Sequence, residues 1–266
     1  MRKSVKQQLA LRVLSTAALM AMVSSIATAA FADTYDLNKG SVTVKTKDDG
    51  ITYVTQENTE ITDHQDNTGV TITSNGEKTS NTITVETAKD QTTDVTLENV
   101  HIEVNTTDAK SGAIEIKGDG DTNLELNGDN TVMVKNGWEE EHAAIEKADK
   151  YGKEGTLTIK DDVNDDGSEK GTDKDTTGTL LAGGYHEAAA IGGGAGDLGD
   201  TSNITITGGE ITVSAEGGGA AIGSIGGVDC KSITINGNAI KSISSKDGAC
   251  IGGAAGGSVG SITISD

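Results

Sequence analysis

The 266-residue chain has no proline, two cysteines, one tryptophan and one phenylalanine. Because proline lacks the N–H that a strand ladder requires, its absence is compatible with unbroken strand pairing along the chain. Two cysteines are too few for a disulfide framework, and either one bridge between Cys230 and Cys250 or two buried thiols stays open. With so few aromatic rings, a core must be filled by Ile, Val, Leu and Ala.

Residues 1–32 differ in composition from the rest of the chain. Basic residues between Arg2 and Arg12 precede an apolar run at residues 13–26, which ends at a small-x-small pattern, Ala30-Phe31-Ala32. The run is too short for a stable membrane anchor, so residues 1–32 are predicted to be a secretory signal peptide. The mature chain would begin near Asp33.

Positive charge is scarce after this segment. Its removal takes away four of the 21 basic residues, which leaves 17 lysines and no arginine against 41 acidic residues, a net charge of about −24. Nucleic acids and anionic membrane surfaces are bound by basic patches. We therefore expect a secreted or extracellular cell-surface protein that neither binds nucleic acid nor inserts into a membrane.

The remaining chain is repetitive. An Ile-Thr-Ile triplet occurs with equal spacing at residues 204–206, 233–235 and 262–264, and an Ala-x-Ile-Gly element recurs at Ile191, Ile222 and Ile251. Earlier units carry residues 157–159, 124–126 and 95–97 in place of the triplet, and Ile145 and Ile114 in place of Ile191. Such self-similarity is the mark of a solenoid.

The spacing of the earlier units is less regular. Leu97 and Leu126 are separated by the same interval as the triplets, and we align Leu126 with Ile159, which is a slightly longer step. The step from Ile159 to Ile206 is the longest, because an acidic insertion at residues 161–178 interrupts the unit.

Alternating apolar and polar residues mark the repeated segments as strands with one buried face. A unit of three short strands cannot bury its apolar face alone, but units stacked at about 4.8 Å enclose an aliphatic column. We therefore predict an all-β, three-sided parallel β-helix over residues 95–266, with coils of about 29 residues. Residues 33–94 are interpreted as N-terminal β coils or a cap, with a separate small β-domain over 33–90 as the alternative.

Residues 194–199 spell G-x-G-x-x-G, the fingerprint of a dinucleotide-binding turn. That fingerprint needs a helix after the glycines, whereas here a strand follows in "DTSNITITGG". Glycine reaches the unusual backbone angles of coil corners without steric cost, so these residues are interpreted as corner glycines.

The acidic insertion contains a D-x-N-x-D-G pattern with a carboxylate at position twelve. This spacing resembles the calcium loops of dockerin modules and EF-hands, although an aspartate replaces the usual glutamate and no helix pattern follows. The sequence predicts a calcium site there, with a plain solvated acidic loop as the alternative. The candidate ligands are Asp162, Asn164, Asp166, Ser168 and Asp173.

Aromatic, histidine and acidic residues gather before two of the Ala-Ala-Ile strands. Both segments lead into neighbouring coils, so the two rings are expected on adjacent turns. Aromatic faces with nearby carboxylates suit sugar rings, while a structural cover over a corner and a His–Glu metal site remain alternatives. The candidate ligand-binding residues are Trp138, Glu140, His142, Tyr185, His186 and Glu187.

Catalysis is not expected. Cleavage of acidic polysaccharides by β-helix lyases generally needs an arginine beside calcium, and the mature chain has none. Glycosidases need paired carboxylates about 5 to 10 Å apart, but no acidic pair here matches the motifs of β-helix polygalacturonases. A polysaccharide-degrading β-helix enzyme is the least favoured alternative.

The segments "DVTLENVHIEV", "NLELNGDNTV", "AAIGGG" and "NITITGGEITVSA" resemble the glycine-rich repeat regions of adhesin-like surface proteins of gut Firmicutes. The resemblance covers about residues 80–266. It implies a right-handed β-helix, a carbohydrate-binding-domain-like role and a bacterial surface location. This chain lacks the sorting motif and surface-layer repeats of that family.

We thus expect a secreted or cell-surface, non-catalytic, adhesin-like module that binds a glycan or a host or microbial surface ligand. A structural stalk or coat protein without a small ligand is the competing interpretation. The last strand, near Asp266, has no polar cap in sequence. Either the protein continues beyond it, or the open C-terminal coil pairs with another chain.

Overall fold

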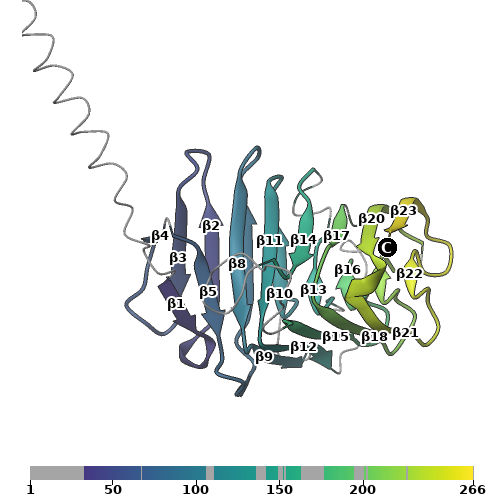
Figure 1. The fold of residues 1–266 in the computed structure, drawn as a ribbon, viewed down its shortest axis with the longest axis horizontal. Helices are drawn as coiled ribbons and strands as arrows, with labels where there is room; N and C mark the ends of the chain where they lie inside the picture. The colour runs from purple at the N-terminus through teal and green to yellow at the C-terminus, as the bar shows by residue number, and fades with distance from the viewer. Residues whose placement is uncertain are drawn as a thin grey trace, which may run out of the picture. The chain divides into compact units, whose positions relative to one another are not determined.

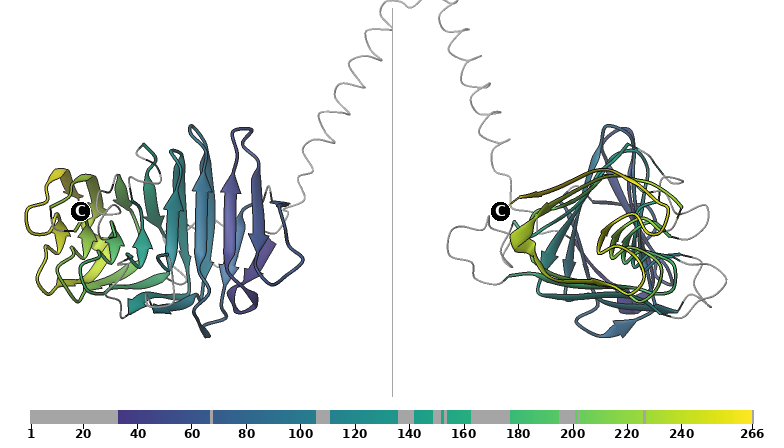
Figure 2. Two further views of the ribbon diagram at one scale, coloured as in Figure 1. Left: turned by 180° about the vertical axis from the view of Figure 1, so that it is seen from behind. Right: turned by 90° about the vertical axis from the view of Figure 1, so that its right-hand side faces the viewer.

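Strands from successive turns of the chain lie side by side in three sheets, here named A, B and C (Figure 1). Each full turn passes from sheet B to sheet A and then to sheet C, and the end-on view in Figure 2 shows the three sides around one interior. The computed structural model describes residues 33–66, 68–105, 111–135, 142–148, 152, 154–162, 177–194, 201, 203–225 and 227–265.

The inner face of sheet A carries ladders of aliphatic side chains. Alternation directs Leu124 and Leu126 inward, where they are buried in register with Val95 and Leu97 of the previous coil. Its strands, in order, are β1 (Asp33–Asp36), β5 (Val70–Thr73), β8 (Thr92–Glu98), β11 (Asp121–Asn127), β14 (Leu157–Lys160), β17 (Ile204–Ile206), β20 (Cys230–Asn236) and β23 (Val259–Ser265).

Sheet B narrows from longer strands near the N-terminus to short Ile-Gly strands toward the C-terminal end. The glycines of these short strands have φ between +133° and +136°, which side chains rarely tolerate. In order, sheet B contains β22 (Ile251–Gly252), β19 (Ile222–Gly223), β16 (Ile191–Gly192), β13 (Ile145–Glu146), β10 (Ile114–Lys117), β7 (Ile83–Thr87), β2 (Val42–Thr46), β3 (Thr52–Gln56) and β4 (His64–Asp66).

Sheet C forms the third side and pairs in parallel throughout the described residues. The inward residues Ile102, Val132, Ala182 and Val213 are stacked in register and buried. Its strands are β21 (Ile240–Ser245), β18 (Glu210–Ala215), β15 (Thr179–Gly184), β12 (Asp129–Lys135), β9 (His101–Asn105) and β6 (Lys78–Thr79).

The three-sided parallel β-helix predicted from the repeat is thus confirmed. Ile204, Ile233 and Ile262 are register partners across β17, β20 and β23, as their equal spacing in sequence requires. The pairing of Ile145 with both Ile114 and Ile191 is confirmed as well.

The predicted alignment of Leu126 with Ile159 is wrong by two positions. Ile159 pairs with Leu124, and Leu157 pairs with Thr122. A shift of two positions leaves every side chain on the same face, so alternation alone could not detect it.

Thr122 belongs to a buried group of hydroxyls between sheets A and B. Thr87 Oγ1 lies 3.1 Å from Thr122 Oγ1 and 2.7 Å from Thr93 Oγ1, and Thr93 Oγ1 donates to Thr46 Oγ1 at 2.6 Å. Each hydroxyl satisfies another, which offsets the cost of burying these polar groups. The interior is therefore polar at this corner.

The N-terminal strands belong to the same sheets as the later coils. β1 pairs in parallel with β5, and β2 pairs in parallel with β7. On the other edge of β2, β3 and β4 run antiparallel and end sheet B. Residues 33–266 form one compact unit.

The two cysteines are not bridged: Cys230 is buried and Cys250 is exposed. The predicted signal peptide, residues 1–32, lies outside the described residues. Among the residues that are described, there is no helix with the length and apolar character needed to cross a bilayer.

Candidate functional site

The outer face of sheet C brings side chains of several coils into register. His101 lies beside Thr131, which lies beside Leu181, and Glu103 lies beside Met133 in the next row. Because strand side chains alternate, these residues all point away from the core. We call this surface the sheet C face.

A hollow of about 200 Å³ lies at the C-terminal ends of β12, β15 and β18. Gly183 and Gly184 carry no side chain here, and a Cβ added to Gly183 would lie 2.4 Å from the Met133 sulfur. The Met133 thioether therefore covers Gly183 and gives the hollow an apolar floor. Its lining residues are Met133, Val134, Lys135, Gly184, Tyr185, Ser214 and Glu216.

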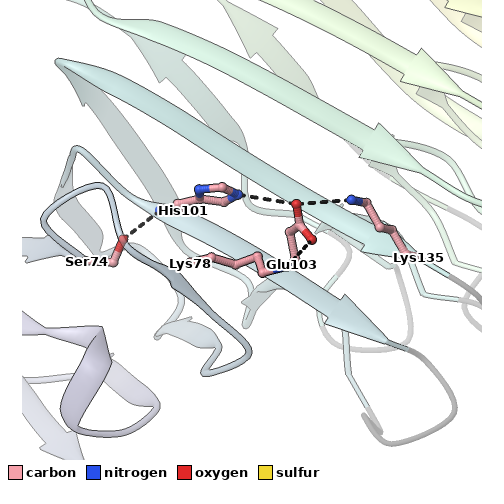
Figure 3. Close-up of polar contacts among 5 residues, drawn as sticks. All are labelled: Ser74, Lys78, His101, Glu103 and Lys135. Atoms are coloured by element: carbon pink, nitrogen blue, oxygen red, sulfur yellow. Dashed lines mark hydrogen bonds and ion pairs between the residues drawn. The ribbon is translucent and has the colours of Figure 1, made fainter.

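Glu103 is the centre of a charged network beside the hollow (Figure 3). Its carboxylate accepts from Lys135 Nζ at 3.0 Å and Lys78 Nζ at 3.2 Å, and it lies 3.4 Å from His101 Nε2. The hydrogen bond from Lys135, helped by Lys78 and His101 and opposed by partial burial, lowers the pKa of Glu103 to about 2. Glu103 thus remains an anion at any physiological pH.

A second hollow, of about 480 Å³, lies at the N-terminal ends of β9 and β12, beside the turn after β5. Polar groups dominate its lining, which consists of Asn75, Gly76, Asn99, His101, Asp129 and Thr131. The backbone N–H of His101 donates to Ser74 Oγ at 2.8 Å, which ties β9 to the turn after β5 (Figure 3). Strand β12 therefore separates two hollows of different polarity.

The predicted aromatic patch falls in different environments. Tyr185 lines the apolar hollow, and His186, at φ +59°, and the exposed Glu187 follow it in the turn toward β16. His142 is buried, with only 3% of its surface exposed. Trp138 and Glu140 lie outside the described residues.

Of the predicted calcium ligands, the structure describes Asp162 alone; Asn164, Asp166, Ser168 and Asp173 lie outside the described residues. Asp162 follows β14 and lies 3.3 Å from Lys160 Nζ, and its backbone N–H donates to Glu125 Oε1 at 2.8 Å. A calcium ion would have to compete with the Lys160 ammonium for this carboxylate.

The G-x-G-x-x-G segment begins at Gly194, and residues 195–200 lie outside the described part. The next described strand, β17, runs over Ile204–Ile206, where the dinucleotide fingerprint requires a helix. The nearby Gly192, the last residue of β16, has φ +136°.

No known family matches the chain. No curated protein and no solved structure is similar to it either.

Sequence reasoning did not single out Met133, Glu103 or Lys135 as site residues. A signal existed, because "HIEVN" and "TVMVK" share the same alternation one coil apart, and stacking them sets His101 beside Thr131 and Glu103 beside Met133. Lys135 reaches Glu103 diagonally, two positions along the neighbouring strand. Tyr185 was found because it precedes one of the Ala-Ala-Ile strands, together with a histidine and a glutamate.

Proposed function

We propose that this chain is a secreted or cell-surface, non-catalytic module that binds a glycan on the sheet C face. The observation that supports it is the hollow beside Tyr185, where one aromatic ring and an apolar floor are surrounded by Lys135, Ser214 and Glu216. Sugar rings present apolar C–H faces and a rim of hydroxyls. This lining offers a partner for each.

The size of the hollow indicates one sugar unit at a time. Its volume of about 200 Å³ is below the roughly 300 to 1,000 Å³ of pockets that enclose whole small molecules. A polymer would lie across the surface and place a single ring against Tyr185.

The second hollow extends this surface. Thr131 lines the polar hollow and Met133 the apolar one, and residues two apart on a strand are separated by about 6.6 Å. A short oligosaccharide can thus reach both hollows along β12. His101 and Asp129 in the polar hollow provide hydrogen-bonding groups for further hydroxyls.

A glycan array followed by calorimetry tests the proposal. We expect Tyr185→Ala to weaken binding of any retained glycan at least tenfold, while Tyr185→Phe retains the ring and most of the affinity. Tyr53→Ala, which removes a ring from β3 in sheet B, is the matched control and should bind normally. Trp138→Ala provides a second test of the predicted patch.

The outcome of the array also separates the alternatives. Silence across acidic, neutral and host glycans would favour a structural stalk or coat protein. Release of reducing or unsaturated sugars from a polysaccharide would support the enzyme interpretation. Equal binding by wild type and Tyr185→Ala would show that the glycan binds elsewhere than in this hollow.

Calcium at the acidic insertion is a separate proposal, based on the ligand spacing that begins at Asp162. Calorimetric titration with calcium chloride should show binding in the wild type and weaker binding in Asp162→Asn. Absence of both heat and a thermal shift at millimolar calcium would end it. Asp129→Asn, a change to another exposed aspartate, at the start of β12, is the control.

Self-association through the C-terminal coil is likewise proposed. Ile262 and Ile264 continue the inward columns of β20, yet they are 46% and 59% exposed on β23. If this edge pairs with a second copy, Ile264→Lys should abolish concentration-dependent oligomers in sedimentation velocity, and Thr263→Lys, on the other face, should affect them less. Monomeric wild-type protein at all concentrations would contradict the proposal.

A further inference from the structure

Two glutamates lie side by side under the surface of sheet B. Glu115 on β10 and Glu146 on β13 are register partners in adjacent coils. Both are outward positions, because Ile114 and Ile145 point into the core, yet Glu115 is 4% exposed and Glu146 is fully buried. Like charges directly opposite on neighbouring strands repel, and burial strengthens the repulsion.

Close backbone packing contributes to this burial. A Cβ added to Gly112 would lie 2.6 Å from the carbonyl oxygen of Ala143 and 3.1 Å from Glu146 Cβ. Glycine at position 112 therefore lets the turn before β10 lie directly against Glu146. The two carboxylates are thus enclosed by the fold and are not a loose surface cluster.

Local cations offset part of the charge. Lys117 Nζ lies 2.7 Å from Glu115 Oε2. On the other coil, His142 Nδ1 lies 2.8 Å from Glu146 Oε2, and the backbone N–H of Ala143 donates to the same oxygen at 3.2 Å. Every one of these contacts uses an Oε2 atom.

The other carboxylate oxygen of Glu146, Oε1, is the group that these contacts do not satisfy. In the part of the chain that the structure describes, Glu146 Oε1 is buried and has no hydrogen-bond partner. A buried carboxylate oxygen without a partner costs more than about 1 to 3 kcal/mol, so native proteins generally satisfy it. One ligand atom from each of Glu115, His142 and Glu146 lies within 4.8 Å of the other two.

We propose that Glu115, His142 and Glu146 bind one divalent transition-metal ion that joins two adjacent coils. One imidazole nitrogen and two carboxylate oxygens form a donor set suited to borderline ions such as Zn²⁺, rather than to calcium, which prefers six to eight oxygens. The ion would satisfy Glu146 Oε1 and cancel the repulsion between the glutamates. Three protein ligands leave one position of a tetrahedral Zn²⁺ for water.

The competing explanation uses protons alone. A protonated His142 beside Glu146, with Lys117 beside Glu115, would also neutralise the two carboxylates, but it supplies nothing to Glu146 Oε1. Metal binding and a proton-only ion pair differ in one measurable respect: only the first gives a stoichiometric metal complex.

The experiment uses the untagged mature chain, stripped with EDTA and then incubated with zinc chloride and desalted. Mass spectrometry of the metal content should find about one zinc per chain, and the thermal midpoint should rise on addition of zinc. The Co²⁺-substituted protein should show visible d–d bands, which report ligation directly. Less than 0.1 zinc per chain in the wild type would overturn the proposal.

Substitutions of the proposed ligands test whether the zinc ion binds at these residues. His142→Gln and Glu115→Gln should each lower zinc affinity at least tenfold; Glu115 has its Lys117 partner at the surface, so this variant is the one expected to remain folded. His101→Gln, in the exposed cluster around Glu103, is the matched control and should retain full zinc content. Unchanged zinc content in both test variants would place the ion elsewhere and refute the site.

Discussion

Two clusters of histidine, glutamate and lysine lie on different sides of the β-helix, and they differ mainly in burial. Around Glu103 on sheet C, the side chains of His101, Lys78 and Lys135 are 32%, 62% and 49% exposed. Around Glu146 on sheet B, His142 and Glu146 are 3% and 0% exposed. The same residue types thus form a solvated network on one side and an enclosed one on the other.

This difference should decide what each cluster contributes. Exposed ion pairs are screened by water and salt and are worth about 0 to 1 kcal/mol each. An enclosed pair is costly to assemble, and removing one partner leaves an uncompensated buried group. We therefore expect the sheet C cluster to contribute little to the free energy of unfolding. The sheet B cluster should contribute strongly to the association of two adjacent coils.

The largest effect is expected for Glu146→Ala. It removes the acceptor of both His142 and the Ala143 N–H, so it should lower the free energy of unfolding by about 3 to 5 kcal/mol. Urea unfolding followed by circular dichroism measures this. Glu103→Ala is the control from the exposed cluster, and a loss no larger in Glu146→Ala than in Glu103→Ala would contradict the contrast drawn between the two sides.

Gly112→Ala should cause the second-largest loss of stability. The new methyl group would approach Ala143 O to 2.6 Å and push the turn away from Glu146, at a cost of about 1 to 3 kcal/mol. Gly227→Ala separates packing from backbone strain, since Gly227 has φ +79° but no atom within 4 Å of an added Cβ. The thermal unfolding midpoints of the two variants are compared with that of the wild type. An unchanged midpoint in Gly112→Ala would show that the backbone at Gly112 is not tightly packed against Glu146.

Glu103→Gln should lower stability by about 1 kcal/mol at neutral pH, reduced by added salt. The folded protein lowers the pKa of Glu103 from 4.5 to about 2. A depressed carboxyl pKa stabilises the folded state above the unfolded value, and this contribution disappears as the pH falls from about 4.5 toward 2. Unfolding at pH 7 and pH 3 should therefore show a smaller difference between wild type and variant at pH 3; a constant difference would exclude an electrostatic origin.

The smallest effect is expected for Lys45→Met. Lys45 and Glu86 form an isolated pair at 2.7 Å on sheet B, and their side chains are 44% and 43% exposed. Its loss should change stability by less than about 0.5 kcal/mol in chemical denaturation. A larger loss of stability in Lys45→Met would mean that solvent exposure does not determine how much an ion pair contributes. The difference between the sheet B and sheet C clusters would then need another cause.

The regular part of the fold was predictable from sequence because the physics is local and repeated. Alternation identifies the buried face, and repetition at a constant interval specifies the stacking of Ile204, Ile233 and Ile262. The coil from β11 to β14 was misaligned because Thr122 reads as a surface residue, whereas it is buried among other threonine hydroxyls opposite Leu157. Single-residue patterns do not reveal that polar residues satisfy one another.

The candidate site was predictable only in part. Tyr185 was identified by its place before an Ala-Ala-Ile strand, but the hollow beside it depends on Met133 lying over Gly183, a contact between coils. The pairing of Glu115 with Glu146 was implicit in the alignment of Ile114 with Ile145, since each glutamate follows its isoleucine. What sequence could not supply is their burial, which depends on the three-dimensional approach of Gly112.

The Ile-Gly strands of sheet B have a consequence for how such a protein can change over generations. β16, β19 and β22 are interchangeable, each pairing Ile with Ile and Gly with Gly across the same step. A duplicated coil inserted among them would keep the same Ile–Ile and Gly–Gly pairing in sheet B, and it would lengthen the molecule by about 4.8 Å. Gene duplication can therefore lengthen this end of the protein one coil at a time while the pairing in sheet B is kept.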